Sequence, residues 1–337
     1  MRLVIRFDMR APQFATPASD LYRASLEIAE WADEAGFSAI YFSEHHGARD
    51  GYCPAPVVQA AALAARTSRI ELRLSALVAT LHHPIQMAEE LAVLDIVSNG
   101  RLAVTLGLGY RPFEFGMYGV EMSTRAPALA EAVEVFRQAW TGEPFTFRGA
   151  PALVRPTPAQ KPGPPLYLGG TTPASARRAA RLGIGYDPAP SHDGDSSLYD
   201  AYVQECRRLG RPAPQPYLRP GPRFLFVSDD PDRDWELHLP YLAHHANAYA
   251  KWRAEAAPQD VLTTPWKGVS TIDDVKANPA FAILTPDECL ELATSLGPQT
   301  ELVFHPLIGG MSPEIAWRGL RAFANDVLPS LRRMGYV

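Results

Sequence analysis

The sequence predicts a (β/α)₈ TIM barrel of the α/β class with an insertion after its seventh strand. Short buried strands alternate with amphipathic helices along 337 residues, a normal length for such a barrel with insertions. Alternation of this kind indicates a parallel sheet with right-handed crossovers. Residues 229–284 are about fifty residues more than a repeating strand–helix unit requires at this point of the chain. We therefore expect one domain, 1–337, in which 229–284 is an insertion or lid segment.

The first half of the chain alternates regularly. Apolar residues recur at helical spacing over 20–35, and Gly36 suits the position just after that helix. Small residues make 56–66 a closely packed helix, and Pro84 suits the first turn of a helix that ends near Ile96. Short apolar runs between these helices predict the first four strands, at 3–7, 38–43, 70–79 and 102–108.

The second half alternates less evenly. A helix at 126–140 precedes a small hairpin outside the barrel, at 145–147 and 152–154. Thr285 and Glu288 form a capping-box pattern, and Ser312 is a cap for the last helix. The remaining strands are predicted at 166–168, 184–187, 223–228 and 302–304, and the remaining helices at 173–183, 198–209, 285–297 and 312–333.

Composition excludes several classes of protein. Apolar residues make up 47% of the chain and charged residues 20%, which favours a large core over disorder. The net charge of -5 argues against nucleic acid as a partner, and four scattered lysines form no polybasic patch for a membrane surface. No apolar run is long enough for a membrane helix or a signal peptide. The three cysteines form no CxxC pair, so we expect a reducing cytoplasmic location and no zinc ribbon.

The strongest candidate for catalysis is Glu44-His45-His46, directly after the second predicted strand. Catalytic residues of barrel enzymes lie at such carboxyl ends. Adjacent residues on a strand point to opposite faces, so only one of the two histidines is expected to face the barrel mouth, and the other supports the rim. His82-His83 ends the third strand in the same way. A four-histidine metal cluster from both pairs is the weaker alternative, because metal ligands on a strand favour i and i+2 spacing.

A second candidate site is the loop Gly169-Gly170-Thr171-Thr172, between a strand and the helix that begins at Pro173. Glycines let the backbone approach an anion, and a helix start favours negative charge. Thr171, Thr172 and Ser175 add hydroxyl groups, so we interpret the loop as a phosphate site. The alternative is an ordinary glycine turn with Thr172 as helix cap.

Three further patterns have weaker interpretations. Gly107-Leu108-Gly109 ends the fourth strand and allows close approach of something flat, but no dinucleotide-binding unit surrounds it. Arg125 and Glu131 are expected to form a structural ion pair. The stripe in 229–284 is expected to pack in a core or between subunits, with a lid over an apolar cleft as the alternative; its members are Trp235, His238, Leu242, His245, Tyr249 and Trp252.

Taken in order, several motifs resemble the bacterial luciferase-like flavin monooxygenases over nearly the whole chain. The motifs that carry the resemblance are Ser43-Glu-His-His46, His83-Pro with Ser98-Asn-Gly-Arg101, Gly107-Leu-Gly109 with Glu114-Phe115, Leu168-Gly-Gly-Thr-Thr172 with Ala179-Ala-Arg-Leu-Gly183, and Val327-Leu-Pro329. The resemblance implies a (β/α)₈ barrel, often a homodimer through its second and third helices. It also implies reduced FMN or a deazaflavin as cofactor.

The resemblance also implies roles for particular residues. His45 is similar to the family's catalytic histidine, with Glu44 and His46 in support. Ser75-Ala76 corresponds to a cis peptide bulge against the flavin ring. Gly169, Gly170, Thr171, Thr172 and Ser175 correspond to the phosphate loop, and Gly107, Leu108 and Gly109 lie beside it. Luciferase has an arginine where this chain has Leu108, so Arg177 or Arg178 is a candidate substitute.

The resulting hypothesis is a two-component flavin monooxygenase. Reduced FMN would come from a separate flavin reductase, and O₂ would oxygenate a small organic substrate, apolar or aromatic, without a metal. The first alternative is hydride transfer with an 8-hydroxy-deazaflavin coenzyme on the same barrel. The others are a flavin-binding protein without turnover and a metal-dependent hydrolase that uses His45, His46, His82 and His83.

Overall fold

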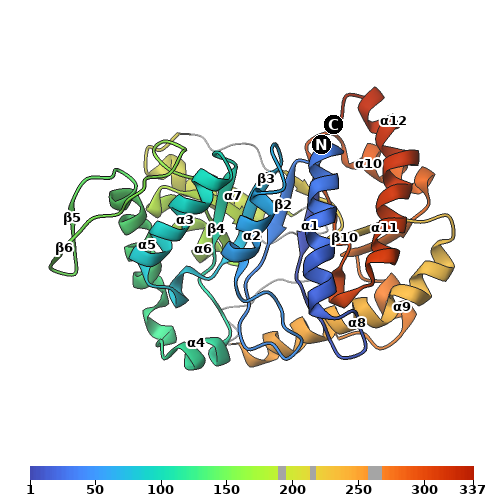
Figure 1. Cartoon of the computed structure of the whole chain (residues 1–337), viewed down its shortest axis with the longest axis horizontal. Coiled ribbons are helices and arrows are strands. Elements are labelled where there is room, and N and C mark those ends of the chain that lie inside the picture. Colours follow the sequence, from blue (N-terminus) through green and yellow to red (C-terminus); the bar gives the residue numbers. More distant parts are fainter. Residues whose placement is uncertain (189–194, 213–217, 257–267) are drawn as a thin grey trace.

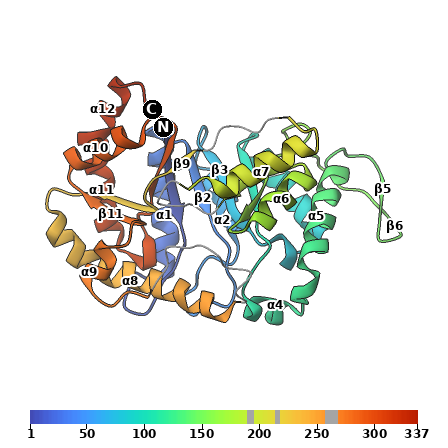
Figure 2. The ribbon, with the colours of Figure 1, turned by 180° about the vertical axis from the view of Figure 1, so that it is seen from behind.

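The computed structural model has an eight-stranded, entirely parallel, curled sheet with helices around its outside (Figures 1 and 2). It describes residues 1–188, 195–212, 218–256 and 268–337. The strand order is β8-β7-β4-β3-β2-β1-β12-β9. Neighbouring strands therefore present their carboxyl ends at one rim, as the alternation of elements predicted.

The sheet strands are β1 (Arg2–Phe7), β2 (Ala39–Phe42), β3 (Glu71–Leu77), β4 (Leu102–Leu106), β7 (Leu166–Gly170), β8 (Gly185–Pro188), β9 (Arg219–Pro220) and β12 (Thr300–Phe304). The helices are α1 (Ala18–Glu34), α2 (Pro56–Ala64), α3 (Pro84–Val97), α4 (Pro112–Tyr118), α5 (Arg125–Ala139), α6 (Pro173–Leu182), α7 (Ser197–Arg208), α8 (Pro231–Glu255), α9 (Ile272–Lys276), α10 (Pro286–Leu296), α11 (Pro313–Ala322) and α12 (Leu328–Arg333).

The first half of the chain folds as predicted. β1 to β4 and α1 to α3 occur in the expected order, and β3 ends at Leu77 before a short 3₁₀ turn at Ala79–Leu81. The predicted hairpin is present as β5 (Phe145–Phe147) and β6 (Ala150–Ala152), which project from the body of the protein (Figure 1). The four strand cores are almost entirely buried because helices cover the outer face of the sheet.

The seventh strand was predicted wrongly as a member of the main sheet. Residues 223–228 form β10 (Phe224–Val227), which pairs in parallel with β11 (Phe281–Leu284) in a separate two-stranded sheet. β9 takes the place beside β12. Pro220 and Pro222 lack the N–H groups that a longer ladder needs, so pairing with β12 stops after the Gly221 N–H donates to Glu301 O at 3.0 Å.

The segment predicted as an insertion, 229–284, contains α8, α9 and β11, while its residues 257–267 lie outside the described residues. The first part of α8 packs on β10 and β11 in a second apolar core. Asp230 caps α8 by accepting from the Arg233 N–H at 3.2 Å. Pro240 lies inside the helix, which continues through it to Glu255.

One short helix, α4, was missed. Pro112 occupies its first turn, and Gly119 ends it with a φ of 66°. The prediction favoured a longer periodic pattern, and seven residues are too few to provide one. Its position directly after β4 places it at the rim.

We predict that protonation of one core histidine destabilises the protein. His238 lies fully buried against Phe226, with ring centroids 4.4 Å apart, and its Nε2 has no hydrogen-bond partner among the described residues. Burial lowers its pKa from 6.5 to about 4. Between pH 6.5 and pH 4, His238 therefore binds a proton in the unfolded chain but not in the folded chain. The free energy of unfolding should fall by roughly 3 kcal/mol as the pH drops from above 6.5 toward 4.

The measurement is the free energy of unfolding in urea at several pH values. His238→Phe should reduce the slope between pH 6.5 and 4, because no proton binds at that site in either state. His83→Phe is the control, since His83 is exposed and should leave the slope unchanged. A slope that is the same in His238→Phe and wild type would refute the assignment.

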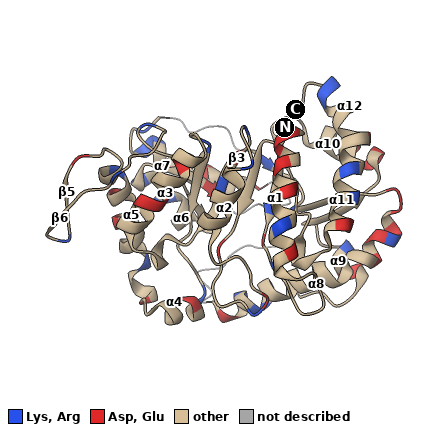
Figure 3. Cartoon of the chain, viewed as in Figure 1, with Lys and Arg blue, Asp and Glu red and all other residues tan. Residues whose placement is uncertain are grey.

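In the ribbon of Figure 3, the positions of basic residues and those of acidic residues are interspersed along the helices. Among the helices of the described ranges, none is both long enough and apolar enough to cross a bilayer. The two termini lie close together in Figure 1, and the Met1 ammonium group donates to the carbonyl of Tyr336.

Candidate active site

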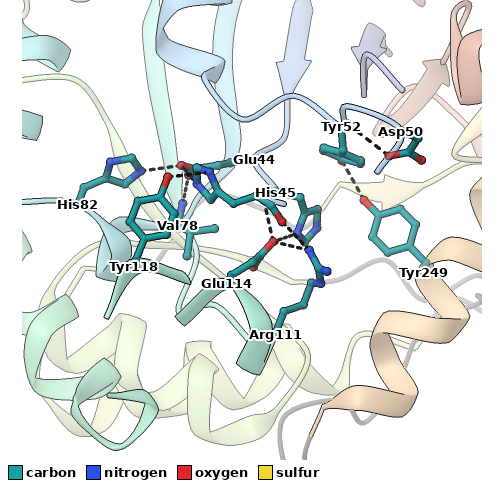
Figure 4. Close-up of polar contacts among 11 residues, drawn as sticks. Glu44, His45, Asp50, Tyr52, Val78, His82, Arg111, Glu114, Tyr118 and Tyr249 are labelled. Atoms are coloured by element: carbon teal, nitrogen blue, oxygen red, sulfur yellow. Dashed lines mark hydrogen bonds and ion pairs between the residues drawn. The ribbon is translucent and has the colours of Figure 1, made fainter. Parts of the chain in front are cut away.

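The polar residues after β2 lie at the rim, as expected, and His45 turns toward the carboxylate of Glu114 (Figure 4). His45 Nδ1 lies 2.9 Å from Glu114 Oε1, whereas His46 Nε2 lies 2.8 Å from Glu44 Oε1. The adjacent histidines therefore contact different carboxylates, but both lie beyond β2, which ends at Phe42, so strand pleating does not set their directions. Glu114 comes from α4, so the missed helix supplies the partner of His45.

Glu114 is a hub of buried hydrogen bonds. Besides His45, its Oε1 accepts from the His46 backbone N–H at 2.9 Å and from Arg111 Nη1 at 2.8 Å. Arg111 also donates to the His46 carbonyl at 3.0 Å. Burial raises the pKa of Glu114, but the hydrogen bonds and charges of its partners outweigh burial and lower that pKa overall. The Glu114 side chain is therefore a carboxylate at neutral pH.

The protonation state of His45 follows from this partner. Burial lowers the pKa of His45, and the hydrogen bond and charge of Glu114 offset burial only in part. The ring is therefore neutral at pH 7. Because a carboxylate can only accept, Nδ1 of His45 carries the proton and Nε2 carries the lone pair. Nε2 makes no hydrogen bond to any of the described residues, so it is available to accept a proton.

The second cluster is centred on Glu44. His46 Nε2 at 2.8 Å, His82 Nε2 at 2.6 Å and the Val78 backbone N–H all contact its carboxylate. Burial opposes ionisation, yet these hydrogen bonds hold the pKa of Glu44 at about 2. The pKa of His82 is raised, because the bond to Glu44 outweighs its burial. His82 and Glu44 thus form an ion pair, and Tyr118 fixes His46 through a 2.9 Å contact to Nδ1.

The four-histidine metal cluster does not form. His45 faces Glu114, and His83 packs on Phe147 with ring centroids 5.5 Å apart. Glu44, His46 and His82 do bring one potential ligand atom each within 4.8 Å of one another. Hydrogen bonds within the cluster account for that arrangement. The expectation that no metal binds stays a prediction.

Aromatic rings surround His45. Their centroids lie 4.6 Å (Trp252), 4.8 Å (Tyr52), 5.8 Å (Tyr110) and 5.8 Å (Tyr249) from that of His45. Tyr249 and Trp252 come from the end of α8, so part of the predicted stripe lines the site. Trp235 and Leu242 lie instead in the second core, as the packing interpretation predicted.

Hydrogen bonds from two histidines hold α8 above the strand ends. His244 Nε2 lies 2.7 Å from Asp50 Oδ2, and His245 Nδ1 lies 3.1 Å from Asp8 Oδ2. Arg10 also pairs with Asp50 and stacks its guanidinium over Trp252, 4.5 Å from the ring centroid. These buried contacts fix the helix that covers His45.

A small-residue platform lies beside Glu44. The Ser75–Ala76 peptide is cis, as the resemblance implied, and the β3–β4 register shifts there. A Cβ on Gly107 would lie 3.2 Å from the Ala76 Cβ, and one on Gly169 would lie 3.9 Å from it. Three strand ends therefore pack closely around Ala76, and larger side chains at Gly107 or Gly169 would crowd them.

The glycine–threonine loop caps α6. Thr172 Oγ1 accepts from the Ser175 N–H at 3.1 Å, and Ser175 Oγ donates to the Thr172 carbonyl at 2.6 Å. A Cβ on Gly170 would overlap Ser175 Oγ, at 2.1 Å. The structure thus includes the cap that was the alternative interpretation. Thr171 lies between this cap and the end of β7, and the helix start remains suited to an anion.

The predicted ion pair between Arg125 and Glu131 is wrong. Glu131 pairs with Arg148 at 2.6 Å, while Arg125 Nη1 donates to the carbonyl of Gly109 at 2.8 Å. Arg125 therefore lies next to Leu108, at the end of β4. Burial and the nearby charge of Arg125 lower the pKa of Arg178, so the two cations lie close together.

The family is established by comparison. The sequence model of the luciferase-like monooxygenase family matches residues 1–294, so the chain belongs to this family. A solved structure, monooxygenase RslO1 from Streptomyces bottropensis, superposes with a TM-score of 0.78 at 26% identity over 98% of this chain and 99% of that one.

Two curated relatives are oxidoreductases with different cofactors. The oxygenase component of a flavin-dependent trigonelline monooxygenase from Acinetobacter baylyi is 30% identical over 185 residues, 53% of this chain and 51% of that protein. The chain thus matches only about half the length of that relative. An F420-dependent glucose-6-phosphate dehydrogenase from Microbacterium testaceum is 26% identical over 99% of both chains. Both flavin and deazaflavin enzymes are therefore among its relatives.

Proposed function

We propose that this protein is a flavin-dependent monooxygenase in which His45 is the catalytic base. The observation that carries the proposal is a neutral, buried imidazole whose Nδ1–H is held by Glu114 and whose Nε2 lone pair has no partner among the described residues. General bases act best in this state near neutral pH. The surrounding aromatic rings support an apolar or aromatic substrate and keep water away from the imidazole.

The proposed cofactor is reduced FMN. Its ring would lie on the Ala76 platform, and its phosphate would lie at the Thr171–Thr172 loop near Arg125 and Arg178. When bound, reduced FMN supplies the electrons that activate O₂. Glu44 and His46 support the rim through their buried hydrogen bonds. The oxygenase-component name of one relative supports a separate reductase as partner.

The alternative cofactor is a deazaflavin, which the relative matched over 99% of both chains favours. The test is a titration of the protein with reduced FMN and with the reduced deazaflavin, followed by mixing with O₂. We expect saturable binding of reduced FMN and slower reoxidation of the bound form than of the free form, because the site excludes water. Binding of the deazaflavin alone, or reoxidation of FMN at the free rate, would contradict the proposal.

We further propose a homodimer through α2 and α3, which lie side by side. Four of their aliphatic side chains are exposed: Val58 (70%), Val93 (47%), Ile96 (43%) and Val97 (47%). Exposed apolar patches of this kind mark protein interfaces. The double substitution Val93→Glu and Val97→Glu should convert a dimer to a monomer in light scattering after size exclusion. Leu153→Glu, near β6, is the control. A monomeric wild type, or a dimeric double variant, would refute this interface.

A further inference from the structure

The inner face of the curled sheet is unusually polar. Branched aliphatic side chains normally fill the interior of such a sheet. Here a cavity of about 370 Å³ remains inside, within the range of about 300–1,000 Å³ that holds small molecules. Its polar and aromatic lining includes Arg2, Arg6, Tyr41, Arg73, Tyr167, Asp187, Tyr199, Tyr202, Arg223 and Glu301.

The cavity lies where the two edges of the sheet fail to pair. Gly185, Asp187 and Pro188 of edge strand β8 line one side, and Pro220 of edge strand β9 lines the other. Because β8 and β9 share no ladder within the described residues, the side chains of the described strands leave a cavity at this point. A ligand can therefore occupy space that neither strand fills.

Positive charge exceeds negative charge in the lining. The lining contains four arginines but only two carboxylates, those of Asp187 and Glu301. Glu71, outside the cavity, pairs with Arg2 at 3.0 Å and with Arg73 at 3.2 Å. Even with Glu71 counted, four positive charges oppose three negative ones. The excess resides on arginines that have no acidic partner.

Those arginines are Arg6 and Arg223. Neither forms an ion pair with any carboxylate in the described ranges of the chain. Arg6 donates to the hydroxyl of Ser43 and also interacts with the hydroxyl of Tyr52. A guanidinium group has five N–H donors, so others remain for a ligand. Burial, together with the charge of Arg6, lowers the pKa of Arg223 to about 10, so the two cations are close enough to repel each other. An anion between them would remove this repulsion.

The acidic residues of the lining are already engaged. Asp187 Oδ2 accepts from Thr105 at 2.8 Å and lies 3.5 Å from Ser75 Oγ. Glu301 Oε1 accepts from the Tyr41 hydroxyl at 2.6 Å. Because both carboxylates already accept hydrogen bonds from neighbouring side chains, neither requires a bound cation. The positive charge of the cavity lining therefore exceeds its negative charge, and a bound anion would balance the difference.

We propose that this cavity binds the carboxylate of a small aromatic acid between Arg6 and Arg223. A guanidinium group matches a carboxylate in shape and can hold it with two hydrogen bonds. Tyr167, Tyr199 and Tyr202 line the same space and would contact the ring of the acid. The Ser43 hydroxyl donates to the Ser75 carbonyl at 2.8 Å, and Ser75 lines the cavity, so the cavity adjoins the Ala76 platform.

The test is calorimetric titration of the full chain, without flavin, with benzoate and with benzamide, which has nearly the same shape but no charge. Benzoate should bind with one-to-one stoichiometry and at least about tenfold more tightly than benzamide, because only the carboxylate can pair with two guanidinium groups. Arg223→Gln should weaken benzoate binding by about tenfold or more. Arg23→Gln, on the exposed face of α1, is the matched control and should bind as the wild type does.

Three results would overturn the proposal: no benzoate binding up to about 10 mM, equal affinity for benzoate and benzamide, or unchanged benzoate affinity in Arg223→Gln. The benzoate–benzamide comparison uses the wild-type protein, so it decides the matter even if Arg223→Gln does not fold. Neither flavin nor oxygen is present in these titrations. Their failure would therefore leave the proposed monooxygenase function untouched, and the failure of that function would leave this site standing.

Discussion

Replacement of His45 by alanine should leave the affinity for reduced FMN within about threefold of wild type and lower product formation roughly 10²–10⁴-fold. The reason is that the buried Glu114 carboxylate holds the Nδ1–H of His45 and leaves its Nε2 lone pair without a partner among the described residues. The alanine removes the proton acceptor, while the Ala76 platform and the Thr171–Thr172 loop remain. Flavin fluorescence measures binding, and substrate-dependent oxygen uptake measures turnover.

The matched control is His83→Ala, because His83 is exposed and contacts Phe147 instead of either carboxylate. It should retain full turnover. Turnover of His45→Ala within a few-fold of wild type would remove His45 from the mechanism. Loss of flavin binding in the same variant would assign His45 to the cofactor site instead.

Glu114→Gln should have the second largest effect. The glutamine keeps the shape of the side chain but loses the charge that raises the pKa of His45 and balances Arg111. The pKa of His45 should then fall further below its ordinary value. A base must be neutral, so wild-type activity is present above this pKa and is lost as the pH falls through it. In the variant this acid limb should move to lower pH.

The plateau of the pH profile should also fall by about tenfold or more, because the amide no longer fixes the Nδ1–H tautomer and Arg111 loses its buried partner. The measurement is oxygen uptake between about pH 4 and 9 in both proteins. Glu131→Gln is the control, because Glu131 pairs with Arg148 far from this network. An acid limb at the same pH in Glu114→Gln and wild type would show that Glu114 does not tune His45.

The position of His45 and His46 at the rim could be predicted, because neighbouring strands of a parallel sheet end at the same edge. The directions of His45 and His46 could not be predicted from strand pleating, because β2 ends at Phe42. The partner of His45 could not be predicted. Glu114 lies 69 residues away along the chain, on a helix too short to show periodicity. Only the pair Pro112 and Gly119, which mark a helix start and a helix end, could have indicated it.

The errors share one physical origin, which is competition between nearby alternatives. Arg125 has Glu131 within two helical turns, yet it donates to the carbonyl of Gly109, because Arg148 takes Glu131. The strand at 223–228 has the composition of a sheet member, but the prolines before it stop the ladder with β12, and β11 offers an equally apolar partner. The strand propensity of a segment predicts that it forms a strand, but it does not predict which strand it pairs with.

The interruption of helix α8 at Pro240 affects which part of the helix can unfold locally. Pro240 has no N–H, so the carbonyl one turn earlier, at Glu236, receives no helical hydrogen bond and the ladder is interrupted there. Residues on both sides of this break, from Trp235 to Ala246, belong to the second core, and the last turns carry Tyr249 and Trp252, which form the wall around His45. One continuous helix thus joins two cooperative units. The wall can be lost by local unfolding of the last turns while the core remains intact.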